Sequence, residues 1–148
     1  MTTDTTRRSL LESVAQQARH AGVFGAVAVT DAGLVCAARD ADAEYRLGWE
    51  DARLWVSLVT PDRWLSESIE ADLMHTGDDI EELLEEELVE QGVEASRPAV
   101  EHFRSEDRLF TFRSPVSRED PMTAIGWLLA YEACFRSLGD MAGAGDDD

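Results

Sequence analysis

The chain has 148 residues, of which 31 are acidic and 13 basic, so its formal net charge is -18. This charge repels DNA, RNA and anionic lipid, which excludes non-specific nucleic-acid binding and attachment to an acidic membrane surface. All 13 bases are arginine, so neither a Schiff-base lysine nor the lysine of a P-loop is available.

The length predicts a single domain that folds without a metal or a disulfide. Hydrophobic residues make up 44% of the chain, and no apolar run approaches the roughly 18 residues of a membrane span. The first residues, MTTDTTRRS, lead into an amphipathic segment that is unlike a signal peptide. We therefore expect a soluble cytoplasmic protein. Cys36 and Cys134 are far apart, and we expect them to be small buried hydrophobes in a strand and a helix.

Helical spacing of apolar residues predicts a first helix over residues 7–21. Two short runs at 23–30 and 34–38 flank turn-forming residues and predict a hairpin. Residues 40–51 are polar enough to form a loop, and 53–60 predict a third strand with both faces partly covered. In that strand Leu54, Val56 and Leu58 share one face, and Trp55 and Val59 share the other.

Two helices are predicted next, over 60–74 and 78–92. The first has Thr60 as a candidate N-cap, while Asp78 or Asp79 would cap the second. The second segment, DDIEELLEEELVEQG, is amphipathic, with its acidic side chains on the arc that faces water. Its apolar face consists of Ile80, Leu83, Leu84 and Leu88.

A second hairpin is predicted from 99–104 and 108–114, followed by a helix that begins near Pro121 and is buried on more than one side. The fold class is therefore α+β, an antiparallel five-stranded sheet with flanking helices in the order α-β-β-β-αα-β-β-α. We expect a single domain over 8–138. It would follow a flexible N-terminus at 1–7 and precede a disordered acidic tail at 139–148.

This order of elements, the length, the acidity and the closing strand-then-helix unit LFTFRSPVSREDPMTAIGWLLAYEACFRSL resemble the type III secretion chaperone-like fold, and in particular its YbjN-like family. The resemblance covers about residues 8–138. The doubled helix of 61–92 departs from it, because that span is longer than the family's usual crossing helix. The resemblance implies a small acidic protein, commonly a homodimer, that binds protein segments or acts as a regulator.

No enzyme motif is present. The chain has no Gly-rich phosphate loop and no GxSxG elbow, and neither cysteine lies in a catalytic signature. His20, His75 and His102 fall on three different predicted elements. We therefore expect no catalytic residue and no cofactor.

A metal site is the main alternative. His75 with Asp78 and Asp79 could supply imidazole and oxygen ligands, and this group is the centre of a second hypothesis, a metal-dependent small-molecule binder or enzyme. We expect no metal there, because the leucines take the inward face of the helix and leave its acids in water. Weak binding of a divalent cation at the exposed acids stays open. The other candidate ligands are Glu81, Glu82, Glu85 and Glu86.

Two further interpretations concern the charge. The acidic helix could mimic the charge of DNA, or the composition could belong to a salt-adapted structural or regulatory domain. Residues 64–96 contain no lysine or arginine, so we expect the acidic helix and a basic second hairpin to face each other within the fold or across a dimer. The arginines of that hairpin and its flanks are Arg97, Arg104, Arg108, Arg113 and Arg118.

The first hypothesis is a non-enzymatic protein-binding domain, homodimeric, that holds a polypeptide segment. An exposed sheet edge would accept an extended peptide by strand addition, and apolar pockets would select its side chains. Aromatic residues are favoured where one side of a ring is buried and the other meets a partner. We expect Trp55 and Trp127 to be core residues more readily than Trp49 and Trp64. The candidate partner-binding residues are Trp49, Trp55, Trp64 and Phe103.

Overall fold

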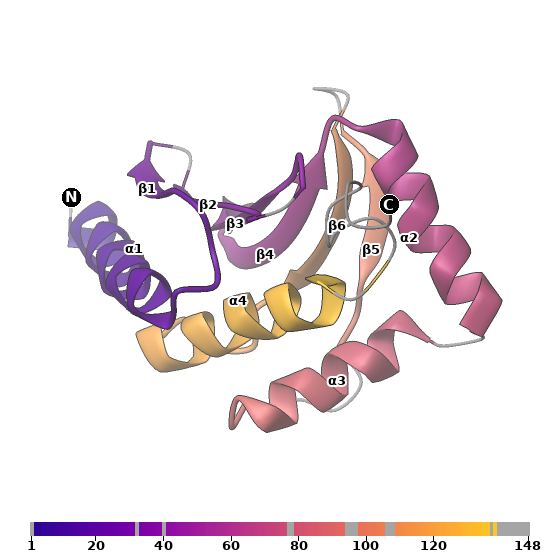
Figure 1. Cartoon of the computed structure of the whole chain (residues 1–148). Helices are drawn as coiled ribbons and strands as arrows, with labels where there is room; N and C mark the ends of the chain where they lie inside the picture. The colour runs from indigo at the N-terminus through magenta and orange to yellow at the C-terminus, as the bar shows by residue number, and fades with distance from the viewer. Residues whose placement is uncertain are drawn as a thin grey trace.

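A computed structural model describes residues 2–31, 33–39, 41–76, 79–93, 98–105, 109–136 and 138. Within these residues the chain is α+β, with four helices and a six-stranded sheet in the order β1-β2-β3-β4-β6-β5 (Figure 1). All neighbouring strands are antiparallel. The elements are α1 (Thr2–Ala21), β1 (Val27–Thr30), β2 (Gly33–Ala37), β3 (Glu44–Glu50), β4 (Arg53–Thr60), α2 (Arg63–Thr76), α3 (Ile80–Glu90), β5 (Glu101–Arg104), β6 (Phe110–Pro115) and α4 (Pro121–Arg136).

The predicted sheet of five strands was wrong by one strand. Residues 40–51 were expected to be a loop, but Glu44–Glu50 is β3, which pairs with β2 and β4 near the centre of the sheet. Tyr45 and Leu47 point into the core, while Glu44 and Arg46 lie on the other face and form an ion pair of 2.8 Å. A polar residue at every second position is what a strand with one uncovered face requires.

The helix boundaries also differ in part from the prediction. α1 begins at Thr2, so residues 2–7 of the segment expected to be flexible are helical. α2 begins after Asp62, whose Oδ1 accepts hydrogen bonds from the backbone N–H of Trp64 and Leu65, so Asp62 rather than Thr60 satisfies the first turn. The predicted acidic tail, 139–148, lies outside the described residues.

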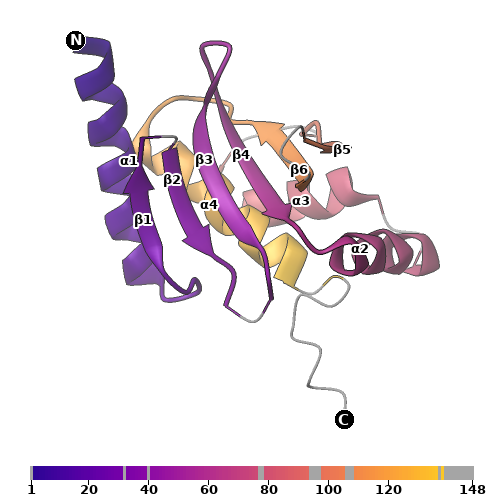
Figure 2. The same cartoon turned by 90° about the horizontal axis from the view of Figure 1, so that it is seen from above.

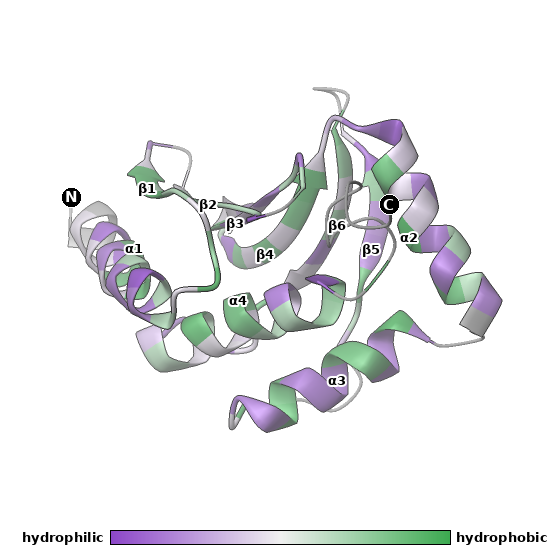
Figure 3. Cartoon of the chain, in the orientation of Figure 1, coloured by the Kyte–Doolittle hydropathy of each residue, from purple (hydrophilic) through white to green (hydrophobic). Residues whose placement is uncertain are grey.

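The described helices lie on one side of the sheet and at its end. Figure 2 views the sheet from the uncovered side, with α4 behind the strands, α1 beside β1 and α2 near the β5 end. α4 is apolar over most of its surface, whereas α3 alternates polar and apolar residues (Figure 3). α3 packs against α4 through Leu84 and Leu88, both fully buried. None of these helices combines the length and the apolar character needed to cross a membrane.

Two local features fix the arrangement. The β3–β4 hairpin turns on Asp51 and Ala52, both at positive φ (54° and 65°), which is the geometry of a tight hairpin turn whose twist matches that of the strands. On α4, a Cβ at Gly126 would clash with Cγ2 of Val93, which lies shortly after the C-terminus of α3. The glycine therefore allows the end of α3 to approach α4 closely.

Candidate functional site

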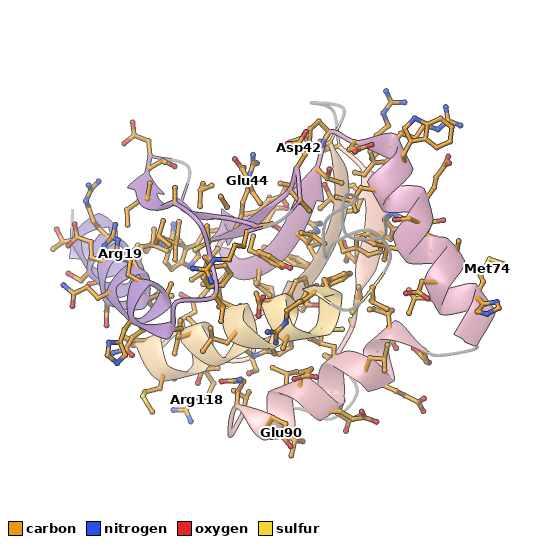
Figure 4. The ribbon with its side chains drawn as sticks, in the orientation of Figure 1. Arg19, Asp42, Glu44, Met74, Glu90 and Arg118 are labelled. Atoms are coloured by element: carbon orange, nitrogen blue, oxygen red, sulfur yellow. The ribbon has the colours of Figure 1, made fainter. Side chains whose placement is uncertain are left out.

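One face of the sheet carries no helix among the residues that the structure describes (Figures 1 and 2). Glu44 lies on this side, whereas Glu90 and Arg118 lie on the opposite side, among the helices (Figure 4). The strands curve around a hollow of about 490 Å³ on this side. We call this surface the open face, and define it by Val35, Arg46, Trp55, Ser57, Val59, Phe103, Thr111 and Arg113.

Arg113 is the centre of the open face. Its guanidinium lies over the ring of Trp55 at 4.0 Å and over the ring of Phe103 at 5.0 Å. It also forms ion pairs with Glu50 and, at 2.9 Å, with Glu101. Because these residues belong to β3, β4, β5 and β6, a single side chain ties four strands together and fixes the positions of both rings.

Electrostatics keep this cluster charged. Desolvation alone lowers the pKa of Arg113, but the hydrogen bonds and charges of Glu101 and Glu50 outweigh it and raise that pKa above its ordinary value. On the neighbouring strands, Arg46 pairs with Glu44. The open face thus presents aromatic and aliphatic surface between paired charges, in a chain whose net charge is strongly negative.

The structure brings together two of the four aromatic residues predicted to bind a partner. Trp55 and Phe103 lie on the open face, on either strand next to Arg113. Trp49 also lines the open-face hollow, but its ring lies on the helix-bearing face, where its Nε1 donates to Glu119 and Arg7 covers the ring. Trp64 is 76% exposed on the first turn of α2. As expected, Trp127 is core, whereas Trp55, for which a core position was also expected, is half-buried.

A second hollow, which we call the α2–β5 groove, lies between α2 and the edge strand β5 and measures about 860 Å³. Phe103 lines both this groove and the open face, so the two hollows adjoin. All four residues of β5 are exposed. The groove is lined by Pro61, Arg63, Ser66, Glu67, Glu70, His102, Phe103, Arg104, Leu109 and Phe110.

His102 joins the two walls of this groove. Its Nδ1 lies 3.2 Å from Oε2 of Glu70, and its Nε2 lies 3.4 Å from Oγ of Ser66, both on α2. Its ring stacks on Phe112 at 3.9 Å with an interplanar angle of 6°. Burial lowers the pKa of His102, and the charge of Glu70 only partly opposes this effect, so the imidazole is neutral near pH 7. No local pattern predicts this cluster, because Ser66 and His102 are 36 positions apart.

The alternative site at His75, Asp78 and Asp79 is only partly described. His75 is exposed at the end of α2, and Asp78 lies outside the described residues. Asp79 is the N-cap of α3, where its Oδ1 accepts from the backbone N–H of Glu81 at 2.9 Å. Within the part of the chain that the structure covers, no three potential ligands lie close enough together to hold a metal ion.

The acidic helix has the predicted orientation. Leu84 and Leu88 are fully buried, whereas Glu82 and Glu86 are exposed. The other two candidate ligands, Glu81 and Glu85, are half-buried, and Oε2 of Glu81 accepts from the backbone N–H of Val100 at 3.4 Å. The leucines thus carry the contact with α4, and the acids lie toward the edge of that contact or in water.

The cysteines lie where the sequence predicted, Cys36 in β2 and Cys134 in α4. Both are free and buried, and burial raises the pKa of each thiol to about 12. Because the thiolate is the reactive form, these thiols are unreactive near neutral pH.

The basic hairpin is engaged within the sheet and its loops. Arg113 pairs with Glu50 and Glu101, and Arg118 lies 3.5 Å from Asp120. Arg104 lies over the ring of Phe110. The remaining two arginines of the predicted basic set, Arg97 and Arg108, lie outside the described residues.

Comparison with known proteins finds no relative. No family model matches the chain, no curated protein matches it, and no solved structure matches it. The resemblance to the YbjN-like family therefore stays a prediction from the order of elements. What the molecule does must be inferred from the open face and the α2–β5 groove.

Proposed function

We propose that this protein binds an extended segment of another polypeptide across the open face and along β5. The observation that carries the proposal is the pair of rings, Trp55 and Phe103, that Arg113 holds in place on the open face. Tryptophan and arginine are enriched among the residues that dominate binding energy in protein interfaces. A rigid, partly desolvated aromatic pair loses little side-chain entropy when a partner arrives.

The edge of the sheet supports the same site. β5 is an edge strand, and an edge strand presents unpaired backbone N–H and C=O groups that a second chain can pair with. The opposite edge, β1, has α1 beside it, and Arg19 of that helix already donates to the carbonyl of Val27. Strand addition at β5 would place alternate side chains of the bound segment toward Phe103 and the open face.

Charge selects the kind of segment. The net charge of -18 attracts a basic polypeptide and repels an acidic one. On the open face itself, Glu50 and Glu101 flank the aromatic pair and can contact basic side chains beside an apolar anchor. The partner we infer is therefore an extended segment in which apolar or aromatic residues alternate with lysine or arginine.

A second copy of this chain is the competing occupant. Two copies repel each other at low salt, because each carries the same large negative charge, and their association strengthens as salt screens the charge. A basic segment shows the opposite salt dependence. The predicted homodimer is measured separately, by light scattering on the purified protein across the same range of salt.

The test uses synthetic peptides and fluorescence anisotropy. A 12-residue peptide with alternating phenylalanine or isoleucine and lysine is compared with a peptide of the same composition in scrambled order and with one in which glutamate replaces lysine. We expect the alternating basic peptide to bind best. Methylation of alternate backbone nitrogens on one edge of the peptide should weaken its binding, and methylation on the other edge should not, if the peptide adds to β5.

Matched variants locate the site. We expect Trp55→Ala and Phe103→Ala each to weaken binding by about 10-fold to 100-fold, the range of an interface residue that costs 1.4–2.8 kcal/mol. Trp64→Ala is the control, because Trp64 is equally aromatic and more exposed but lies outside both hollows. Equal effects of Trp55→Ala and Trp64→Ala, or equal binding of the scrambled and alternating peptides, would refute the proposal.

A further inference from the structure

The α2–β5 groove brings together a serine, a histidine and a glutamate, the three kinds of group found at a serine nucleophile. Oγ of Ser66 faces Nε2 of His102, and Nδ1 of the same ring faces the carboxylate of Glu70. In the tautomer with its proton on Nδ1, beside the carboxylate, the lone pair of Nε2 is directed at the serine hydroxyl. A nucleophile, a base in reach of it and a third group that orients the base define this kind of site on unrelated folds.

We propose that Ser66, His102 and Glu70 form a nucleophilic site that hydrolyses carboxylic esters with a small apolar acyl group. Ser66 is the nucleophile, His102 is the general base and acid, and Glu70 is a positioning residue. The three residues lie beside the open face but include neither Trp55 nor Phe103. The proposal is therefore independent of the proposed function.

The local structure prepares the three groups. Ser66 and Glu70 are one helical turn apart on α2, so their side chains share a face of that helix. The stack of His102 on Phe112 fixes the plane of the imidazole between them. Burial keeps the ring neutral near pH 7 by lowering its pKa, which leaves it able to accept the serine proton.

The groove also offers the remaining parts of an ester site. Ser66 lines a hollow of about 860 Å³, whose apolar wall is formed by Leu109 and Phe110 and suits a short acyl chain. The first backbone N–H groups of α2 are already bonded to Asp62, so they do not serve as donors to a developing oxyanion. The guanidinium of Arg104, which lines the same groove, is the donor we infer for the negative charge on the carbonyl oxygen.

The reaction consumes only the ester and water. Oγ of Ser66 attacks the carbonyl carbon while Nε2 of His102 takes the hydroxyl proton. The ester C–O bond breaks, and the alcohol leaves with that proton, so that an acyl group remains on Ser66. A water molecule then attacks the acyl carbon and gives a proton to Nε2, which returns it to Oγ as the carboxylic acid departs.

The test combines turnover and labelling. The full-length protein is assayed with 4-nitrophenyl butyrate and is incubated with an alkyl fluorophosphonate, whose adduct is located by mass spectrometry. We expect one adduct, on Ser66. Ser66→Ala should abolish the adduct and lower kcat/KM by at least about 100-fold, the contribution expected of a positioned base acting on its nucleophile. His102→Phe should do the same while it preserves the aromatic stack on Phe112, which guards against a loss of fold.

Glu70→Gln tests the positioning role. Because the charge of Glu70 raises the pKa of His102, its removal should move the acidic limb of the pH–rate profile to lower pH, a change that loss of packing alone does not produce. Circular dichroism and the melting temperature establish that each variant is folded. Folded Ser66→Ala that hydrolyses the ester as fast as the original chain, or a fluorophosphonate adduct on any residue other than Ser66, would overturn the proposal.

Trp55→Ala separates this proposal from the function proposed above. It should weaken peptide binding and leave ester hydrolysis unchanged, because Trp55 lines the open face but not the groove. Ser66→Ala should leave peptide affinity unchanged, because Ser66 lines the groove but not the open face. Loss of both properties in Trp55→Ala would contradict the separation of the two sites.

Discussion

Replacement of Arg113 tests whether one side chain organises the open face. Arg113→Ala removes the guanidinium, and the folded state loses its two ring contacts, each worth about 0.5–1 kcal/mol at a partly exposed site. It also loses two ion pairs, each worth about 0–1 kcal/mol. The side chain of Arg113 is only 22% exposed, which places the pairs in the upper part of that range. We expect the free energy of unfolding to fall by about 2–4 kcal/mol in total.

Arg113→Lys separates charge from shape. Lysine keeps a positive charge near Glu50 and Glu101, but it has neither the planar group that stacks on rings nor the fork that bonds two carboxylates. About half of the loss should therefore remain in Arg113→Lys. The same variant should weaken binding of the alternating basic peptide, because Trp55 and Phe103 are then no longer held in place.

The assay is urea unfolding followed by far-UV circular dichroism, with tryptophan emission as a second probe. Arg53→Ala is the control, because Arg53 is an exposed arginine at the start of β4 and its loss should cost no more than about 0.5 kcal/mol. A cost for Arg113→Ala no larger than that for Arg53→Ala would refute the reasoning. Full stability in Arg113→Lys would show that charge alone suffices and that stacking contributes nothing.

The remaining predictions concern the core, a turn and pH. Gly126→Ala should destabilise the fold by about 1–3 kcal/mol because of its clash with Val93, and Val93→Ala in the same chain should restore part of the loss, as measured in urea. Ala52→Gly should raise the unfolding free energy by about 1 kcal/mol, since it relieves a positive φ in the β3–β4 turn, and a lower melting temperature would contradict this. Burial raises the pKa of Glu132 above 4.5. The neutral carboxyl therefore stabilises the folded state below pH 4.5, and this stabilisation is lost as pH rises through the folded-state pKa. Glu132→Gln should therefore melt above the original chain at pH 7 and together with it below about pH 4.5.

The sequence contained the information for β3, although the prediction missed it. Tyr45, Leu47 and Trp49 alternate with Glu44, Arg46 and Gly48, which is the period of a strand, and Asp51 and Ala52 then provide the two-residue turn before β4. The polar members of this alternation suggested a loop because the segment was taken as polar throughout. On a sheet with one uncovered face, those same polar residues are favoured at alternate positions.

The positions of the tryptophans follow from the same hairpin. In the β3–β4 pairing, Trp49 lies opposite Leu54 and Trp55 lies opposite Gly48, which places the two rings on opposite faces of the sheet. Both tryptophans were predicted to bind a partner, because the pairing register of β3 and β4 was not part of the prediction. A strand assignment for residues 44–50 with a turn at 51–52 would have separated them before any coordinates were known.

The cluster of Ser66, His102 and Glu70 could not have been predicted in the same way. The spacing of Ser66 and Glu70 on one helical face is visible in the sequence, but it is common in helices and carries no chemistry by itself. What makes the cluster is the position of α2 beside β5, which depends on the packing of α2 and on the pairing of β5 with β6. Nothing local to either segment encodes that contact.

The salt dependence of the binding rates tests whether the acidity serves the proposed binding role or adaptation to salt. The carboxylates at the open face are paired with arginine, whereas the exposed acids of α3 lie on the far side of the molecule from that face. Under the proposed function, the net charge attracts a basic segment from a distance, and on contact the segment meets aromatic rings between paired charges. Such an arrangement should make the association rate fall steeply with salt while the dissociation rate changes little. Acidity that served only to keep the chain folded in a salty solvent would leave both rates insensitive and would appear instead as a melting temperature that rises with KCl.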